Sequence, residues 1–169
     1  IPGLATVDVL TSENLWQLRA LPKRLLIMGG GAMGCEMAQA FQRLGAEVTL
    51  VDTMVHLLPK EDADVVARLT QTLQEEGVRV VINSEIISFV AEDAEQSALV
   101  KGPDGKTNSV IFDRVLVAVG RRANTSGFGL DLMGVALNAD GTVNVDKFLR
   151  TSCPTIFACG DVAGPYQLT

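Results

Sequence analysis

The distribution of hydrophobic positions divides the chain into short apolar runs and amphipathic stretches. Residues 24–28, 47–51 and 78–82 are each dominated by aliphatic side chains, which predicts strands buried on both faces. Between these runs, residues 32–44 and 61–76 carry apolar side chains at intervals of three and four, and a glycine follows each stretch, which predicts helices. This alternation of strands and helices predicts parallel strands joined by right-handed crossovers.

The pattern changes in the middle of the chain. The stretches "EIISFVAE", "SALVK" and "TNSVIF" are short strand candidates, and the turn sequence "GPDGK" joins the last two, as in an antiparallel hairpin. The apolar run "RVLVAVG" (114–120) then predicts a return to the centre of the parallel sheet. We therefore predict an α/β fold with a Rossmann-like parallel sheet, in which a three-stranded antiparallel β-meander replaces one crossover helix. Before this body, Ser12 and Pro22 bracket a short helix candidate in a lead-in segment.

Composition and charge narrow the classes of function. The chain is 47% hydrophobic and 20% charged, with a net charge of −6 and scattered basic residues. This balance is typical of a globular protein and argues against a nucleic acid as partner. Three cysteines without a signal segment predict reduced thiols in the cytoplasm. A first residue other than methionine indicates a piece of a longer or processed chain.

The stretch "GGGAMG" supplies the spacing Gly29-x-Gly31-x-x-Gly34 between a predicted strand and a predicted helix. In such a turn the first glycine permits a tight bend, the second lets the backbone approach a pyrophosphate, and the third permits close packing of the helix on the strand. The helix start offers free N–H groups to phosphate oxygens. Asp52 ends the next strand at the separation expected for an acid that binds the ribose. These features predict a dinucleotide site.

Asp52 also predicts the choice of nucleotide. A carboxylate accepts hydrogen bonds from a ribose 2′-hydroxyl and repels a 2′-phosphate, and the following "TMVHLLP" contains no arginine. We therefore expect NAD to be preferred over NADP.

Other reactive side chains have simpler interpretations. His56 is the only histidine and has no partner at metal-ligand spacing, so we expect a surface or half-buried side chain and no metal site. Cys35 follows the last glycine of the turn and is expected to be a buried packing residue. Cys153 and Cys159 would lie about 20 Å apart in a strand, beyond disulfide reach, so a redox pair is not expected.

Four ordered stretches together resemble one family. The stretches "LPKRLLIMGGGAMGCEMA", "VTLVD…LLP", "VLVAVGRRANT" and "GVALNADGTVNVDKFLRTSCPTIFACGDVAG" are similar to the NAD-binding domain of the pyridine nucleotide–disulfide oxidoreductases. Dihydrolipoamide dehydrogenase, mercuric reductase and glutathione reductase are members of this flavoprotein family. The resemblance covers essentially the whole chain.

The resemblance implies a role for particular residues. Glu36 would lie near the nicotinamide carboxamide, Ile86 would wall the adenine pocket, Gly120 would close over the dinucleotide, and Asp161 would hydrogen-bond the ribityl chain of FAD. No catalytic residue is expected within this chain. The implied NAD contacts are Gly29, Gly30, Gly31, Ala32, Met33, Gly34, Glu36, Asp52, Ile86 and Gly120.

The resemblance also implies how the chain is divided. Residues 1–21 would be the exit from a missing FAD-domain segment, 22–147 the NAD-binding domain, and 148–169 the start of the second FAD segment. The partners would be the missing FAD and dimerisation domains of the same polypeptide, in a parent enzyme that is a homodimer.

The implied activity is hydride transfer between NADH and FAD in the full-length parent, while the fragment binds nucleotide without turnover. One alternative is the NAD domain of an NADH oxidase or peroxidase with a single redox cysteine. Another, from a different class, is a non-catalytic Rossmann module that senses NAD.

Overall fold

The computed structural model describes residues 1–92 and 95–164. The chain forms two compact units, one of residues Ile1–Gly120 and a second that begins at Arg121. The predicted division at residues 21/22 and 147/148 is not tested by this observation and stays a prediction. Each unit is described by itself.

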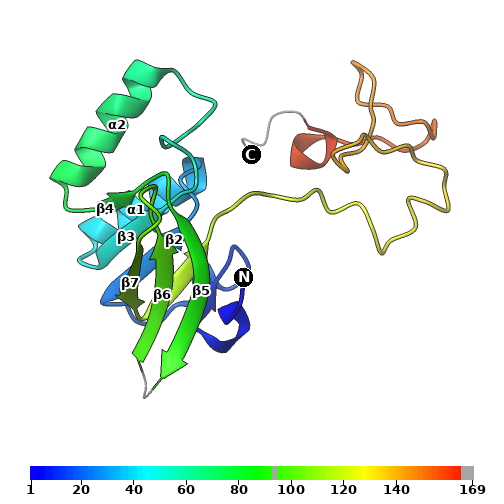
Figure 1. The fold of residues 1–169 in the computed structure, drawn as a ribbon. Coiled ribbons are helices and arrows are strands. Elements are labelled where there is room, and N and C mark those ends of the chain that lie inside the picture. Colours follow the sequence, from blue (N-terminus) through cyan, green and yellow to red (C-terminus); the bar gives the residue numbers. More distant parts are fainter. Residues whose placement is uncertain (93–94, 165–169) are drawn as a thin grey trace. The chain divides into compact units, whose positions relative to one another are not determined.

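The first unit contains a five-stranded parallel sheet in the order β1-β8-β2-β3-β4 (Figure 1). The sequence predicted four of these strands, whose bounds are β2 (Arg24–Met28), β3 (Glu47–Val51), β4 (Arg79–Val81) and β8 (Arg114–Val117). The strand β8 lies between β1 and β2, so it is an interior strand, while β2 is the middle one. All pairings in this sheet are parallel, as predicted.

Two helices and a second sheet cover the parallel sheet. The helices α1 (Ala32–Arg43) and α2 (Ala63–Glu75) lie within the two predicted helical stretches. The antiparallel sheet β5-β6-β7 is the predicted meander, and its bounds are β5 (Glu85–Glu92), β6 (Glu95–Lys101) and β7 (Thr107–Phe112). The fold class predicted from the sequence is therefore confirmed.

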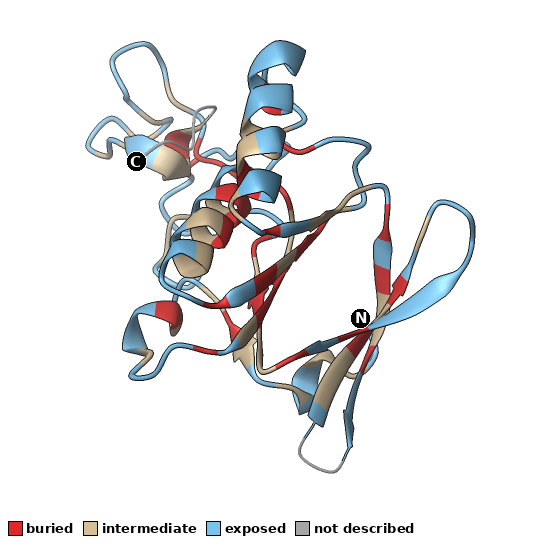
Figure 2. Cartoon of the chain, turned by 90° about the vertical axis from the view of Figure 1, so that its left-hand side faces the viewer, coloured by how far each residue is buried: buried red, intermediate tan, exposed pale blue. Residues whose placement is uncertain are grey.

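The alternation of side chains along β2 explains why that strand is apolar throughout. Leu25 and Ile27 belong to a core with α1 and α2, whereas Leu26 packs in a second core with the meander. Figure 2 shows the resulting three layers, with buried residues along the strands and on the inner sides of the helices. Because both faces of β2 are covered, every position in its middle must be apolar.

The segment before β2 differs from the prediction. The expected helix after Ser12 is only a single 3₁₀ turn, η2 (Leu15–Gln17). The Asn14 side chain accepts a hydrogen bond from Thr11 N at 2.7 Å and donates to Val9 O at 2.9 Å, which competes with helical hydrogen bonding. The same segment contributes β1 (Val9–Leu10) to the parallel sheet and a 3₁₀ turn, η1 (Leu4–Thr6).

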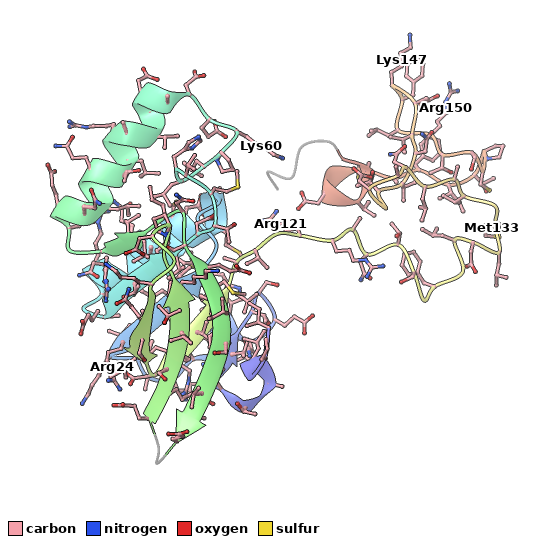
Figure 3. The ribbon with its side chains drawn as sticks, viewed as in Figure 1. Arg24, Lys60, Arg121, Met133, Lys147 and Arg150 are labelled. Atoms are coloured by element: carbon pink, nitrogen blue, oxygen red, sulfur yellow. The ribbon has the colours of Figure 1, made fainter. Side chains whose placement is uncertain are left out.

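The second unit contains little regular structure among its described residues. Its elements are the 3₁₀ turn η3 (Gly160–Ala163) and two isolated bridges, Leu137 with Val143 and Arg150 with Phe157. The stretch "TIFAC" (155–159) contributes only the bridge of Phe157 with Arg150. Lys147 and Arg150 are labelled in Figure 3. Lys147 Nζ lies 5.1 Å and Arg150 Cζ 5.0 Å from the centre of the Phe148 ring.

Candidate functional site

The glycine turn lies where the order of the sheet reverses. Leaving β2, the chain continues through α1 to β3 on one side of β2, whereas β8 pairs on the other side. Gly29 N donates to Val51 O at 2.9 Å, and Ala118 N donates to Met28 O at 2.8 Å, so the turn is held at the carboxyl ends of β2, β3 and β8. This is the position at which open α/β sheets bind their ligands.

Two glycines of the turn are required by the fold itself. A Cβ on Gly34 would lie 1.9 Å from Gly29 O, and one on Gly29 would lie 2.5 Å from Ala118 O. Gly29 also has a φ of 109°, which L side chains rarely adopt. The predicted role of Gly34 in close packing of helix and strand thus has a direct geometric basis.

Gly31 differs from its neighbours because the fold does not require a glycine there. Its φ of −73° and ψ of −176° suit any residue. A Cβ at this position would meet no described atom within 4 Å. The space in front of Gly31 is therefore open to an approaching group.

The N-terminus of α1 offers hydrogen-bond donors beside this space. Gly31 is the N-cap residue and makes no side-chain capping hydrogen bond. The intrahelical hydrogen bonds begin with Cys35 N, which donates to Gly31 O at 3.0 Å, so the amides of Ala32, Met33 and Gly34 have no acceptor within the helix. Such a helix start, with its partial positive charge, suits a phosphate group.

Asp52 lies directly after β3 and faces the glycine turn. Its Oδ2 accepts a short hydrogen bond from Gly30 N, and its Oδ1 accepts one from Met54 N at 2.7 Å. The side chain is half-buried. The link between Asp52 and Gly30 joins residues 22 positions apart and has no signal in the sequence, because no local pattern encodes it.

The first turn of α1 carries two further groups. Glu36 is exposed, which leaves its carboxylate accessible to a ligand. Cys35 is buried, as predicted, and its thiol lies 3.5 Å from Gly30 O. Burial, together with the charges of Asp52 and Glu36, raises the pKa of this thiol to about 11, so at neutral pH it is protonated and can donate a hydrogen bond.

Ile86 and Gly120, the other two predicted NAD contacts, have different surroundings. Ile86 on β5 is 4% exposed and packs in the core between the two sheets, which leaves little of its side chain to line a pocket. Gly120 has a φ of 138°, and a Cβ at this position would meet no described atom within 4 Å. The roles of both residues stay predictions.

In the second unit, Asp161 lies in η3 and forms an ion pair with Arg121, with Nη1 and Oδ2 2.7 Å apart. The two residues come from the "VGRR" and "GDVAG" stretches, 40 positions apart. The sequence pointed to Asp161, but nothing in it signalled Arg121 as a partner.

The remaining candidates form no second site. His56 is exposed, as predicted, and its Nδ1 lies 2.9 Å from Leu57 O. Cys153 and Cys159 are both free thiols. Within residues 1–92 and 95–164, no group of histidine, cysteine, aspartate and glutamate side chains could hold a metal ion. None of the described helices is long and apolar enough to span a bilayer.

Two surface hollows of the first unit lie away from the glycine turn. One is formed by residues 5–8 with 91–92 and 95–96, and the other by residues around η2 together with Asp113 and Arg114. The second hollow reaches the amino ends of β2 and β8, opposite the edge at which parallel sheets bind ligands. At the candidate site itself, the observed feature is the open space in front of Gly31.

The sequence of this chain is similar to one protein family and to several of its members. The family described as pyridine nucleotide-disulphide oxidoreductase matches residues 1–169. A dihydrolipoyl dehydrogenase of Thermus scotoductus is 39% identical over 161 residues, which cover 90% of this chain and 35% of the relative. A mercuric reductase of Streptomyces lividans is 40% identical over 162 residues, covering 96% of this chain and 34% of the relative.

Solved structures agree with the sequence relatives. The HOCl-induced flavoprotein disulfide reductase RclA from Escherichia coli matches with a TM-score of 0.87 and 32% identity, covering 99% of this chain and 38% of that one. The chain thus spans about a third of the length of the proteins it matches. A family match over the full sequence, together with the glycine turn at the switch point of the sheet, shows that this chain belongs to the pyridine nucleotide-disulphide oxidoreductase family.

Proposed function

We propose that this chain is the NAD(H)-binding domain of an FAD-dependent pyridine nucleotide–disulfide oxidoreductase, and that it positions the nicotinamide for hydride transfer with FAD. The observation that carries the proposal is the open space at Gly31, where the fold itself has no need of a glycine. A bound pyrophosphate would explain the glycine, because a Cβ at residue 31 would occupy the space that the phosphate must enter.

The residues around Gly31 fit the phosphates of a dinucleotide. The amides of Ala32, Met33 and Gly34 supply donors for phosphate oxygens, and the start of α1 supplies a partial positive charge. NADH, when bound, supplies the hydride. The chain's own contribution is to hold the dinucleotide at a fixed place and orientation relative to the acceptor, which lowers the entropic cost of the reaction.

We further propose that the site prefers NAD over NADP. The Asp52 carboxylate stands at the end of β3, where it can accept hydrogen bonds from ribose hydroxyls and repels a 2′-phosphate. In residues 53–59, which follow it, the sequence has no arginine to pair such a phosphate.

The remaining assignments rest on the family resemblance. Glu36 would contact the nicotinamide carboxamide, Ile86 the adenine, and Gly120 the outer side of the dinucleotide. Asp161 would bind the ribityl chain of FAD. In this chain Asp161 also forms an ion pair with Arg121.

For the full-length parent we propose a cytoplasmic homodimer in which an FAD domain and a dimerisation domain complete the enzyme. Residues 1–21 and 148–169 would connect the NAD domain, residues 22–147, to the two FAD segments. The electron acceptor would be a disulfide, a metal ion or a similar substrate. Without these parts, the present chain would bind nucleotide but not turn it over, and the purified chain is expected to be colourless.

Replacing Gly31 by alanine tests the proposal. We expect Gly31→Ala to weaken NADH binding by about tenfold or more in titration calorimetry, because the methyl group stands in the phosphate space. The free energy of unfolding should stay within about 0.5 kcal/mol of the wild-type value or rise slightly, since the backbone there suits alanine. NADPH binding, measured in parallel on the wild type, is expected to be weaker than NADH binding.

Two results would contradict the proposal. Unchanged NADH affinity in Gly31→Ala would show that the glycine turn does not bind the dinucleotide. Equal affinities for NADH and NADPH would show that the site has no preference for NAD. A yellow, flavin-loaded preparation would contradict the proposed division of the chain.

A further inference from the structure

We propose that Asp52 has a second role, as a positioning residue that holds the pyrophosphate turn in its binding conformation. This inference rests on the proposed function and deepens it. It makes Asp52 act on the phosphates through Gly30, in addition to any contact with the ribose.

The peptide groups of Gly30 are held from three directions. Gly30 N donates to Asp52 Oδ2, which is fixed at the end of β3. Gly30 O accepts from Leu58 N at 2.9 Å and lies 3.5 Å from the Cys35 sulfur. The β3 terminus, the loop after it and the first turn of α1 therefore all hold the residue that precedes Gly31.

Asp52 is itself immobilised, so it can act as an anchor. Its backbone N donates to Val81 O and its carbonyl accepts from Ser84 N, both at 3.0 Å. Its second carboxylate oxygen accepts from Met54 N at 2.7 Å. The carboxylate is thus fixed through both its backbone and its side chain, and its position determines where the Gly30 amide points.

The same carboxylate has room for a ligand. An ionised carboxylate offers about four acceptor positions, and the hydrogen bonds from Gly30 N and Met54 N occupy two of them. The side chain is half-buried, so one side remains accessible. Asp52 can therefore hold the turn and accept hydrogen bonds from ribose hydroxyls at the same time.

The absence of a side chain at residue 30 serves this link. A Cβ on Gly30 would lie 2.5 Å from Leu57 Cδ2 and 2.9 Å from Asp52 Oδ2. Leu57 is fully buried and has little room to move, so a methyl group at residue 30 would displace the carboxylate. Gly30 and Gly31 are thus adjacent glycines with different purposes: the first admits the carboxylate and the second admits the ligand.

A ligand without ribose hydroxyls separates the two roles of Asp52. With 2′,3′-dideoxy-ADP, a residue that contacts only the ribose hydroxyls has nothing to bind, while a residue that positions the turn still matters. The comparison uses Asp52→Asn and Asp52→Ala in the chain of residues 1–169. Both variants lack the negative charge, so repulsion between Asp52 and the phosphates does not differ, but asparagine keeps an oxygen that can accept from Gly30 N.

We expect Asp52→Ala to bind 2′,3′-dideoxy-ADP about five- to tenfold more weakly than Asp52→Asn, because the loss of one positioning hydrogen bond corresponds to about one tenfold step in affinity. In the ligand-free chain, the Gly30 amide should exchange its hydrogen slowly in the wild type and in Asp52→Asn, and rapidly in Asp52→Ala. Equal affinities of the two variants for 2′,3′-dideoxy-ADP would overturn the proposal.

Gly30→Ala provides an independent variant should Asp52→Ala fail to fold. It leaves the ribose-binding residue in place but displaces its carboxylate, and we expect it to weaken 2′,3′-dideoxy-ADP binding to a similar degree. Wild-type affinity in Gly30→Ala would count against the positioning role. If the wild-type chain bound neither NADH nor ADP, the proposed function would fail, while exchange at the Gly30 amide would still report on the link itself.

Discussion

At the scale of single residues, the glycine turn combines demands of the fold with demands of a ligand. Gly34 must lack a side chain because Gly29 O occupies the place of its Cβ, whereas a Cβ on Gly30 would crowd the side chains of Leu57 and Asp52. Gly31 meets neither restriction. A spacing rule treats Gly29, Gly31 and Gly34 alike, whereas the structure gives each position its own physical reason.

Cys35 provides a prediction at this scale. Burial and the nearby carboxylates raise the pKa of its thiol from 9.0 to about 11, so at pH 8 only about 0.1% is thiolate, the reactive form. Cys159 is exposed. We expect iodoacetamide at pH 8 to modify Cys159 fully before Cys35 reacts, as measured by mass spectrometry of the folded chain.

Unfolding in urea supplies the control, because all three cysteines should then react at similar rates. Equal rates for Cys35 and Cys159 in the folded chain would contradict the prediction.

The raised pKa of Cys35 also makes the free energy of unfolding depend on pH. The folded state binds this proton more tightly than the unfolded state, so the free energy of unfolding falls as pH rises from about 9 toward 11.

At the scale of elements, an ion pair joins the two sheets at the amino end of β2. Arg24, labelled in Figure 3, donates from Nη2 and Nε to Asp113 Oδ1 at 2.7 and 3.1 Å, and its backbone N donates to Asp113 Oδ2 at 2.8 Å. Asp113 stands between β7 and β8. Burial opposes the charge of this carboxyl, but the hydrogen bonds from Arg24 outweigh burial and hold its pKa below the usual range.

We expect Asp113→Asn to lower the free energy of unfolding by about 1.5–3 kcal/mol at pH 7, the range for hydrogen bonds to a charged group. Because the folded-state pKa is lowered, the carboxylate stabilises the protein above its unfolded pKa of about 4, and this contribution is lost as pH falls through the folded pKa. Urea denaturation at pH 7 and pH 3 measures both effects. If Asp113→Asn lowered the free energy of unfolding equally at pH 7 and pH 3, the charge of Asp113 would not be the cause.

The strands and helices of the first unit were predictable because their patterns are strong and local. β2, β3 and β5 match the predicted residues, since apolar runs bounded by glycine and polar residues leave few alternatives. η2 was wrongly predicted as a longer helix because the hydrogen bonds of the Asn14 side chain override a plausible cap. β1 has only two residues, too short for periodicity to reveal.

The site was predictable in part for a related reason. The spacing of Gly29, Gly31 and Gly34 together with Asp52 is a sequence signal with a known mechanism, and the structure brings these residues together. The hydrogen bond between Asp52 and Gly30 and the ion pair of Arg121 with Asp161 depend on contacts between distant segments. No local pattern specifies such contacts.

At the scale of the whole molecule, the two hydrophobic cores formed by the described residues lie within the first unit. The core between the helices and the sheet and the core between the two sheets use only residues up to Ala118. A unit with its own core can fold by itself. The proposed nucleotide contacts, from Gly29 to Gly120, lie in this unit as well.

We therefore expect a chain of residues 1–122 to unfold cooperatively and to bind NADH within about threefold of the affinity of residues 1–169, a difference of less than about 0.7 kcal/mol. Ending two residues after Gly120 keeps this proposed contact inside the shortened chain. Thermal unfolding and titration calorimetry test the two expectations. The shortened chain with Gly31→Ala is the matched control, and it should fold equally well but bind NADH about tenfold more weakly. A shortened chain that folds cooperatively yet loses NADH would instead assign part of the nucleotide site to the residues beyond Arg122.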